Sequence, residues 1–267
     1  MKKLLPALAA LCMSVNALAD DQFSLTTGFD YSSGKYGNAA STDILYIPVV
    51  GKYETDNMTL KLTVPYISVT GPGGVIQGMG RVAPPASTTA AMPSLGRPAK
   101  GGGTTTTSNS GLGDVIASAG YSVYSVDALT LDVVGKIKFG TADASKGLGT
   151  GMNDYSAQID GYYTLRKKTT LFATAGYTVV GAPTGIAVNN VAYGMLGVSQ
   201  KVDDIRNVGV MLNVVQAITA TSGNQEDVTL FASQKLSPTL KAQAYVLKGF
   251  ANGSPDYGGG GMITGYF

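Results

Sequence analysis

The chain has 267 residues, with 19 basic and 17 acidic side chains, no histidine and a single cysteine, Cys12. Without histidine or a second cysteine, the usual zinc sites, histidine-ligated haem and cysteine–histidine catalysis are excluded, and we expect no cofactor. The nearly balanced charge gives no reason to expect nucleic acid as a partner.

Residues 1–19 have the pattern of a secretory signal peptide. Lys2 and Lys3 form a basic start, an apolar run follows, and Ala17–Ala19 is a small-residue cleavage site. The apolar run is too short to cross a membrane as a helix, so we expect it to be removed during export. A lipoprotein anchor on Cys12 is the alternative.

Removal of this segment changes the charge and the chemistry of the chain. It takes away two lysines and the cysteine, which leaves 17 basic and 17 acidic residues and no possible disulfide. No later apolar run is long enough for a membrane-spanning helix. The exported chain is therefore expected to be either a soluble β protein or a membrane β-barrel.

The remaining sequence repeats one pattern, in which apolar and polar residues alternate as they do in strands with one oily and one wet face. In chain order the runs are Phe23–Tyr31, Asp43–Tyr53, Met58–Val69, Asp114–Val123, Leu129–Phe139, Asp154–Leu165, Thr170–Val180, Ala192–Val202, Val208–Ala217, Asp227–Leu236, Leu240–Phe250 and Tyr257–Phe267. Each run has about ten residues, the length that a tilted strand needs to cross the hydrocarbon layer.

The connections between these runs also alternate in length. Short turns are expected at 54–57, 125–128, 166–168, 203–207 and 237–239, and longer loops at 32–41, 70–111, 141–152, 181–190, 217–226 and 251–256. Short turns on one rim and long loops on the other, with an even strand count, are typical of bacterial outer-membrane barrels. We therefore predict an all-β fold, an antiparallel up-and-down transmembrane barrel of about 12 strands formed by residues 20–267. A soluble sandwich is the alternative, although its architecture does not require short and long connections to alternate.

Residues 71–111 interrupt the pattern with Gly, Pro, Ala, Thr and Ser. The segment carries Arg81, Arg97 and Lys100 and no acidic residue. A connection of this length is unusual in a compact domain and is normally functional or disordered. It could be a mobile extracellular loop or an inward plug, in which case the three basic residues are candidates for a constriction.

The strand phase places a set of charged residues on the wet face. These lumen-lining candidates are Asp30, Lys61, Asp114, Asp132, Lys136, Lys138, Asp154, Asp160 and Lys241. The runs containing Asp132 and Asp160 are neighbours and should pair antiparallel, so that acids and lysines meet across the interior. These residues could form a salt-bridge ladder that fills a narrow lumen, or a field of opposite charges that lines a pore.

Motifs for catalysis are weak. Ser32 and Lys35 have Ser-x-x-Lys spacing but stand in a Gly/Asn-rich loop without supporting motifs, and Gly258–Gly261 lacks the lysine and helix of a phosphate loop. Asp203 and Asp204 are expected in a solvated turn. Without histidine the usual general base is also missing, so we expect no enzyme.

Three segments resemble one known family. Phe29–Gly37, Leu62–Tyr66 and Ser110–Asp114 are similar to the outer-membrane family named for the meta-pathway of phenol degradation. The resemblance covers most of the exported chain but not residues 71–111. It implies an outer-membrane transporter of Gram-negative bacteria for small, often aromatic, compounds.

The end of the chain resembles the signal that the outer-membrane assembly machinery recognises, with Tyr266 and Phe267 as the aromatic terminus. Together these features predict a barrel in outer-membrane lipid that acts as a passive channel for small, aromatic or hydrophobic solutes. A structural or surface-interaction barrel without an open pore is the alternative.

Overall fold

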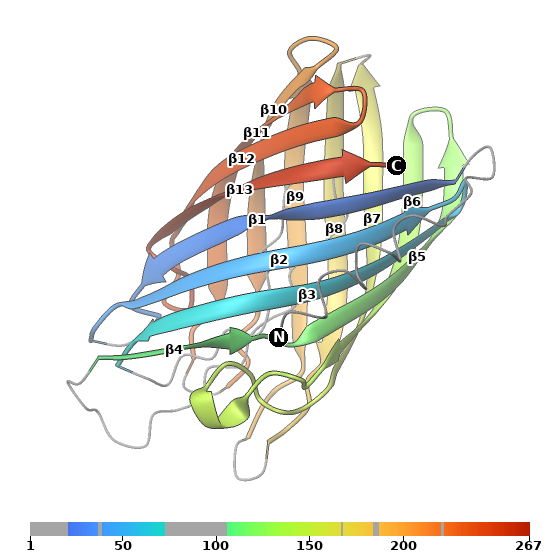
Figure 1. Cartoon of the computed structure of the whole chain (residues 1–267). Coiled ribbons are helices and arrows are strands. Elements are labelled where there is room, and N and C mark those ends of the chain that lie inside the picture. Colours follow the sequence, from blue (N-terminus) through green and yellow to red (C-terminus); the bar gives the residue numbers. More distant parts are fainter. Residues whose placement is uncertain (1–20, 37–38, 73–105, 167, 184–186, 220–221) are drawn as a thin grey trace.

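The computed structural model describes residues 21–36, 39–72, 106–166, 168–183, 187–219 and 222–267, most of which lie in β-strands (Figure 1). The strands are β1 (Gln22–Gly34), β2 (Thr42–Glu54), β3 (Met58–Gly71), β4 (Thr107–Leu112), β5 (Val115–Val126), β6 (Leu129–Phe139), β7 (Asp154–Arg166), β8 (Thr169–Val179), β9 (Val191–Lys201), β10 (Arg206–Val215), β11 (Gln225–Ser237), β12 (Leu240–Gly249) and β13 (Tyr257–Tyr266). A short 3-10 helix, η1 (Ala144–Lys146), lies between β6 and β7. Among the described residues, no helix is long and apolar enough to cross a membrane.

The strands form one antiparallel sheet that closes on itself. β1 pairs with both β2 and β13, and the chain of pairings runs through consecutive strands back to β3. β3 pairs with β5 along Met58–Thr63 and with β4 along Tyr66–Gly71. Because β4 and β5 share one place in the ring, the 13 strands fill 12 positions. The predicted 12-stranded up-and-down barrel is confirmed.

One predicted boundary is wrong. The expected loop over residues 71–111 overlaps β4, which pairs with the end of β3 in register from Tyr66↔Leu112 to Gly71↔Thr107. Threonine, serine and glycine gave this stretch the composition of a loop. In the barrel, its backbone instead satisfies the hydrogen-bonding groups of β3, and a side-chain bond between Thr70 and Ser108 (2.9 Å) joins the two strands.

The alternating connections lie where the sequence predicted them. At one rim, two to four residues separate β2 from β3, β5 from β6, β7 from β8, β9 from β10 and β11 from β12. At the opposite rim, the connections are longer, and that between β6 and β7 carries η1. This parity is that of outer-membrane barrels.

The outer face of the barrel is apolar. Leu62, Leu196 and Val246 leave 50%, 62% and 60% of their surfaces exposed, and many other leucine, valine and tyrosine side chains share this face. Charged side chains in the opposite phase point inward, as the burial of Lys61 on β3 and Lys136 on β6 shows. So much exposed apolar surface is stable in lipid rather than in water, which excludes the soluble sandwich.

Candidate channel interior

The predicted lumen-lining residues occupy the inner face of the barrel. Seven of them are buried, with 1% to 6% of the surface exposed: Asp30, Lys61, Asp114, Lys136, Lys138, Asp154 and Asp160. Asp132 and Lys241 are half-buried. Their contribution to a solute path stays a prediction.

Lys138 joins two carboxylates near the rim with the long loops. Its Nζ lies 3.1 Å from Asp114 Oδ2 and 2.8 Å from Asp154 Oδ2, and all three side chains are almost fully buried. The other oxygen of each carboxylate accepts a backbone N–H group at 2.9 Å, from Ala142 and from Gly181. Buried charges are tolerated when they are paired and hydrogen-bonded in this way. The triad therefore connects β6, β7 and the residue just before β5 to the two loops that follow β6 and β8.

The loop between β6 and β7 packs against the inner face. Its Leu148 is 1% exposed and lies in a cluster with Ile44, Tyr46 and Ile67 from β2 and β3. The loop is held in shape by η1, where the Asp143 side chain accepts the backbone N–H groups of the first turn. A hydrogen bond from the Ser145 hydroxyl lowers the pKa of the Asp143 carboxyl. This ordered connection was predicted only as a loop.

A polar network lies deeper in the barrel. Tyr193 Oη donates to Gln158 Oε1 (2.9 Å), and Gln158 Nε2 donates to both oxygens of Asp160 (2.8 and 2.7 Å). Thr174 Oγ1 donates to the same carboxylate at 2.6 Å. The ammonium group of Lys136 lies 5.8 Å from the centre of the Tyr193 ring, within the range of a cation–π interaction. The network thus connects β6 with β9 along the inner face, over β7 and β8.

The expected meeting of acids and lysines on β6 and β7 is only partly present. Lys138 pairs with Asp154, which lies opposite it in the register. Asp132, however, lies opposite Asp160, so that two acids face each other at this position. The alternation along each strand predicts the face on which these residues lie, but the register between strands decides which of them meet.

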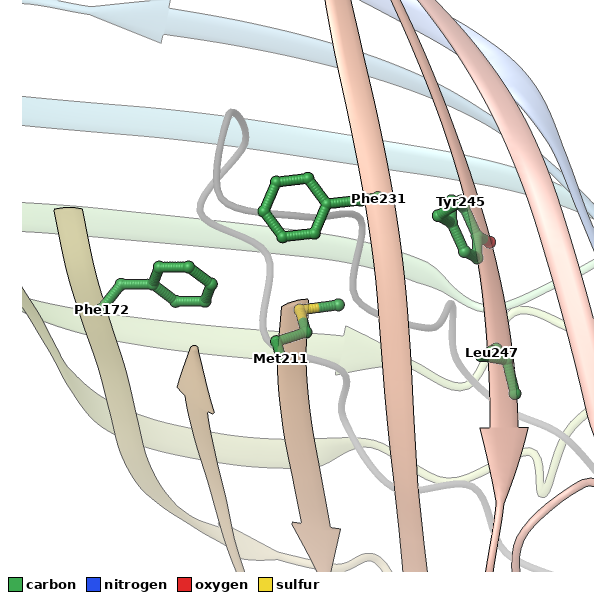
Figure 2. Close-up of a cluster of buried hydrophobic side chains, with 5 residues drawn as sticks. All are labelled: Phe172, Met211, Phe231, Tyr245 and Leu247. Carbon is green, nitrogen blue, oxygen red and sulfur yellow. The ribbon is translucent and has the colours of Figure 1, made fainter. Parts of the chain in front are cut away.

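A second part of the inner face is apolar. Figure 2 shows five buried side chains from β8, β10, β11 and β12 that point toward one another: Phe172, Met211, Phe231, Tyr245 and Leu247. Tyr162, Met195 and Met262 pack against them. We call these eight residues the apolar wall. The interior therefore has charged side chains on β3, β6 and β7 and just before β5, whereas most of the apolar wall lies on β8 to β13.

Glycines on adjacent strands make room for the large rings. A Cβ atom at Gly197 would overlap the Phe172 ring, and one at Gly209 would overlap the Phe231 ring. The rings can therefore lie flat against the backbone of the next strand instead of extending into the centre. The two rings are 6.3 Å apart in a tilted arrangement, which is favourable for aromatic pairs.

The apolar wall was missed at the sequence level, although a signal was present. Phe172 and Tyr162 fall in the polar phase of their strands, which an outward-facing residue would not do. Large side chains in this phase, with glycines on the next strand, indicate rings on the inner face.

A cavity of about 340 Å³ opens at the rim with the short turns. Its wall includes Lys61, Ser118 and Val134, and its outer part includes the acids Glu54, Asp56 and Asp132. Glu54 is paired with Lys52 at 2.6 Å. The cavity therefore has acids toward solvent and an ammonium group further in.

The proposed constriction residues Arg81, Arg97 and Lys100 lie outside the described residues. The same holds for the predicted signal peptide.

Comparison with solved structures places the fold among porins. The NanC porin aligns with a TM-score of 0.54 at 10% identity, covering 91% of this chain and 99% of that chain. The KdgM porin aligns with a TM-score of 0.52 at 9% identity over the same shares, and its complex with disordered oligogalacturonate aligns at 0.50 and 8%, covering 92% and 99%. At these identities the likeness shows the fold alone. No protein-family model matches the sequence. No curated protein matches it either.

Proposed function

We propose that the protein is a passive outer-membrane channel for small solutes. The observation that carries this proposal is a closed barrel with an apolar outer face and an inner face that holds ionisable groups. Ionisable side chains are costly in a membrane and are used where they face a water-filled or substrate path. The KdgM and NanC porins, which share this fold, agree with this proposal.

The solutes are proposed to be small and aromatic or hydrophobic in part. The apolar wall gives the interior an apolar region for such a group, although Phe172, Phe231 and Met211 are only 2%, 6% and 1% exposed and would have to move to contact it. Membership of the phenol meta-pathway family is likewise part of this proposal and rests on the three sequence segments. Ligand sites commonly combine an apolar lining with a few polar groups.

Export through the signal peptide and assembly through the aromatic terminus complete the proposal. The Phe267 backbone N–H donates to the Phe23 carbonyl oxygen, and the two rings are 6.0 Å apart. Phe267 itself is 68% exposed, so it is accessible to an assembly partner. The porins that share the fold support an outer-membrane location and a role other than catalysis.

A barrel without an open pore is the second candidate. The observation that favours it is the close packing of Lys136, Gln158, Asp160 and Tyr193, each less than 8% exposed. Barrels of small diameter tend to fill their interiors with side chains in this way.

Reconstitution in liposomes separates the two candidates. Liposomes loaded with an impermeant polymer should swell in isotonic solutions of small sugars or amides when they contain the folded protein. A matched preparation with heat-unfolded protein is the control. Swelling equal to the control, with the barrel shown to be folded by circular dichroism, would favour the closed structural barrel.

A further inference from the structure

Lys235 and Lys241 face each other near the rim with the short turns. They lie directly opposite each other in the register of β11 and β12. Both lie on the inner face, because Lys235 follows the buried Phe231, and Lys241 precedes the buried Tyr245, by an even number of residues. The Cβ atoms of such a pair are about 5 Å apart, and like charges at this spacing destabilise a sheet. The barrel therefore keeps an unfavourable pair of positive charges at this place.

A third lysine, Lys201, lies close to this pair. It ends β9 and is opposite Asn207 of β10, which is in turn opposite Ser233 of β11. Ser233 comes two residues before Lys235, on the same face of β11. Because β9 and β11 are about 10 Å apart across β10, the three lysines share one region of the inner face. We call Lys201, Lys235 and Lys241 the basic arc.

The positive charge of the basic arc is not balanced by its own strands. The charges that act on Lys241 are those of Lys52 and Lys235, and both are positive. Of the strands β9 to β13, only β11 carries acidic residues, and these are Glu226 and Asp227 at its other end. Within the described part of the chain, the ammonium groups of the basic arc form no ion pair.

The acids of the neighbouring turns do not compensate for this charge. Asp203 pairs with Arg206 at 2.7 Å, and Glu54 pairs with Lys52 at 2.6 Å. Asp204 lies in the turn after β9 and forms no ion pair with the basic arc as far as the described residues show. The lysines of the basic arc are exposed or half-buried, so that a solute in the mouth of the barrel can reach them. A negatively charged group bound there would relieve their repulsion.

We propose that the basic arc binds the phosphate group of a small phosphate monoester. Near neutral pH such a group carries about 1.5 to 2 negative charges and three acceptor oxygens, which match the two opposed ammonium groups of Lys235 and Lys241. A group with one negative charge would leave one lysine of the pair uncompensated. Ser233 and Gln243, opposite each other two residues further from the rim, offer a hydroxyl and an amide beside the lysines. The site goes beyond the proposed channel function and does not require conduction.

Isothermal titration calorimetry of the full chain in micelles of an uncharged detergent measures this binding. Phenyl phosphate is the probe, at about pH 8, where its phosphate group is doubly charged. Benzenesulfonate has the same ring and three oxygens but one negative charge, and phenol is the uncharged match. The wild type should bind phenyl phosphate, and it should bind benzenesulfonate and phenol at least about tenfold more weakly, because only the dianion compensates both opposed lysines.

Lys235→Gln and Lys241→Gln should each weaken phenyl phosphate binding about three- to tenfold, since the partly hydrated lysines contribute less than they would in a dry site. Lys235→Arg keeps the charge and should retain binding. Lys248→Gln is the matched control, because Lys248 is also a lysine of β12 but is exposed on the outer face near the other rim; it should leave binding unchanged. Each glutamine variant removes one of two opposed like charges, so neither should unfold at a lower urea concentration than the wild type.

Equal binding of phenyl phosphate and benzenesulfonate, or unchanged phenyl phosphate binding in both glutamine variants, would overturn the inference. The comparison of these two ligands needs only the wild type, so it decides the matter even if a lysine variant does not fold. Phenyl phosphate binding without conductance would support the site and contradict the channel function. Conductance without phenyl phosphate binding would overturn the site and leave the channel function standing.

Discussion

The hydroxyl of Tyr245 on β12 donates a hydrogen bond to the carboxylate of Asp30 on β1, across the strand that separates them. That strand is β13, and Gly260 is its residue opposite both partners. The tyrosine ring can cross only because Gly260 has no side chain. A charged residue of the inner face is thereby joined to the apolar wall.

Replacement of Gly260 by alanine should therefore destabilise the barrel. The new Cβ atom would lie 2.7 Å from Tyr245 Oη and would overlap the Phe29 carbonyl oxygen. Overpacking of this kind costs about 1 to 3 kcal/mol. Urea unfolding of the protein in lipid vesicles measures the change. Gly261→Ala is the control, since its Cβ would make only an ordinary contact of 3.5 Å with the Phe29 ring; equal stability of the two variants would show that the crossing does not depend on Gly260.

Lys138→Met should lower the free energy of unfolding by more than the substitution of a surface lysine does. It leaves the carboxylates of Asp114 and Asp154 buried without the ammonium group that pairs with both. Removing one partner of a buried ion pair costs about 3 to 5 kcal/mol. The free energy of unfolding in urea should fall by this order at pH 7.

Lys146→Met is the matched control for the triad. Lys146 is in the same loop region, but it is more than half exposed and its carboxylate partner is 3.8 Å away. Exposed pairs contribute about 0 to 1 kcal/mol, so this variant should stay close to the wild type. The interpretation of the triad fails if both variants lose the same stability.

Leu148→Ala should release the loop between β6 and β7 from the inner face. Leu148 is 1% exposed and is the loop's largest buried side chain. Replacing a buried leucine by alanine lowers stability by about 2 to 5 kcal/mol. Here the loss should favour local opening of the loop rather than unfolding of the barrel. Limited proteolysis should cut the loop faster, and the single-channel conductance should rise. Leu196→Ala, on the outer face at 62% exposure, should change neither property; unchanged cleavage in Leu148→Ala would contradict the packing described for this loop.

Asp203 gives a prediction for the dependence of stability on pH. Hydrogen bonds from the Arg206 side chain, followed by backbone N–H groups of the turn, lower the pKa of the Asp203 carboxyl. A lowered pKa in the folded state stabilises the protein above the unfolded value of about 3.9, and this contribution is lost as the pH falls through the folded value. The wild type should be more stable than Asp203→Asn by a constant amount from about pH 5 upward, and the difference should shrink below about pH 4. Asp204→Asn is the neighbouring control. If the stability difference between the wild type and Asp203→Asn increased on acidification, the lowered pKa of Asp203 would be contradicted.

The barrel could be predicted because its determinants are local. Strand length, two-residue periodicity and loop parity are all properties of single segments, as Leu129–Phe139 illustrates. The inner position of Lys136 follows from the same periodicity, since a strand turns alternate residues to opposite faces. The β4 strand was not predicted, because it forms by pairing with β3, which is distant in the sequence, and its own composition is that of a loop.

The contacts inside the barrel depend on register and curvature, which single segments do not encode. The triad at Lys138 requires two strands, the residue before β5 and two loops to meet, and the Asp30–Tyr245 bond joins residues at opposite ends of the chain. The apolar wall likewise requires rings and glycines on neighbouring strands. The sequence therefore predicts on which face of a strand each side chain lies, but not which side chains it contacts.

The central claim is that the barrel conducts solutes, and single-channel recording in a planar lipid bilayer tests it most directly. The folded protein should give discrete current steps in potassium chloride, and Lys61→Gln together with Lys136→Gln should shift the reversal potential in a salt gradient toward cation preference. The account is contradicted if a folded, correctly inserted barrel gives no current steps at any applied voltage.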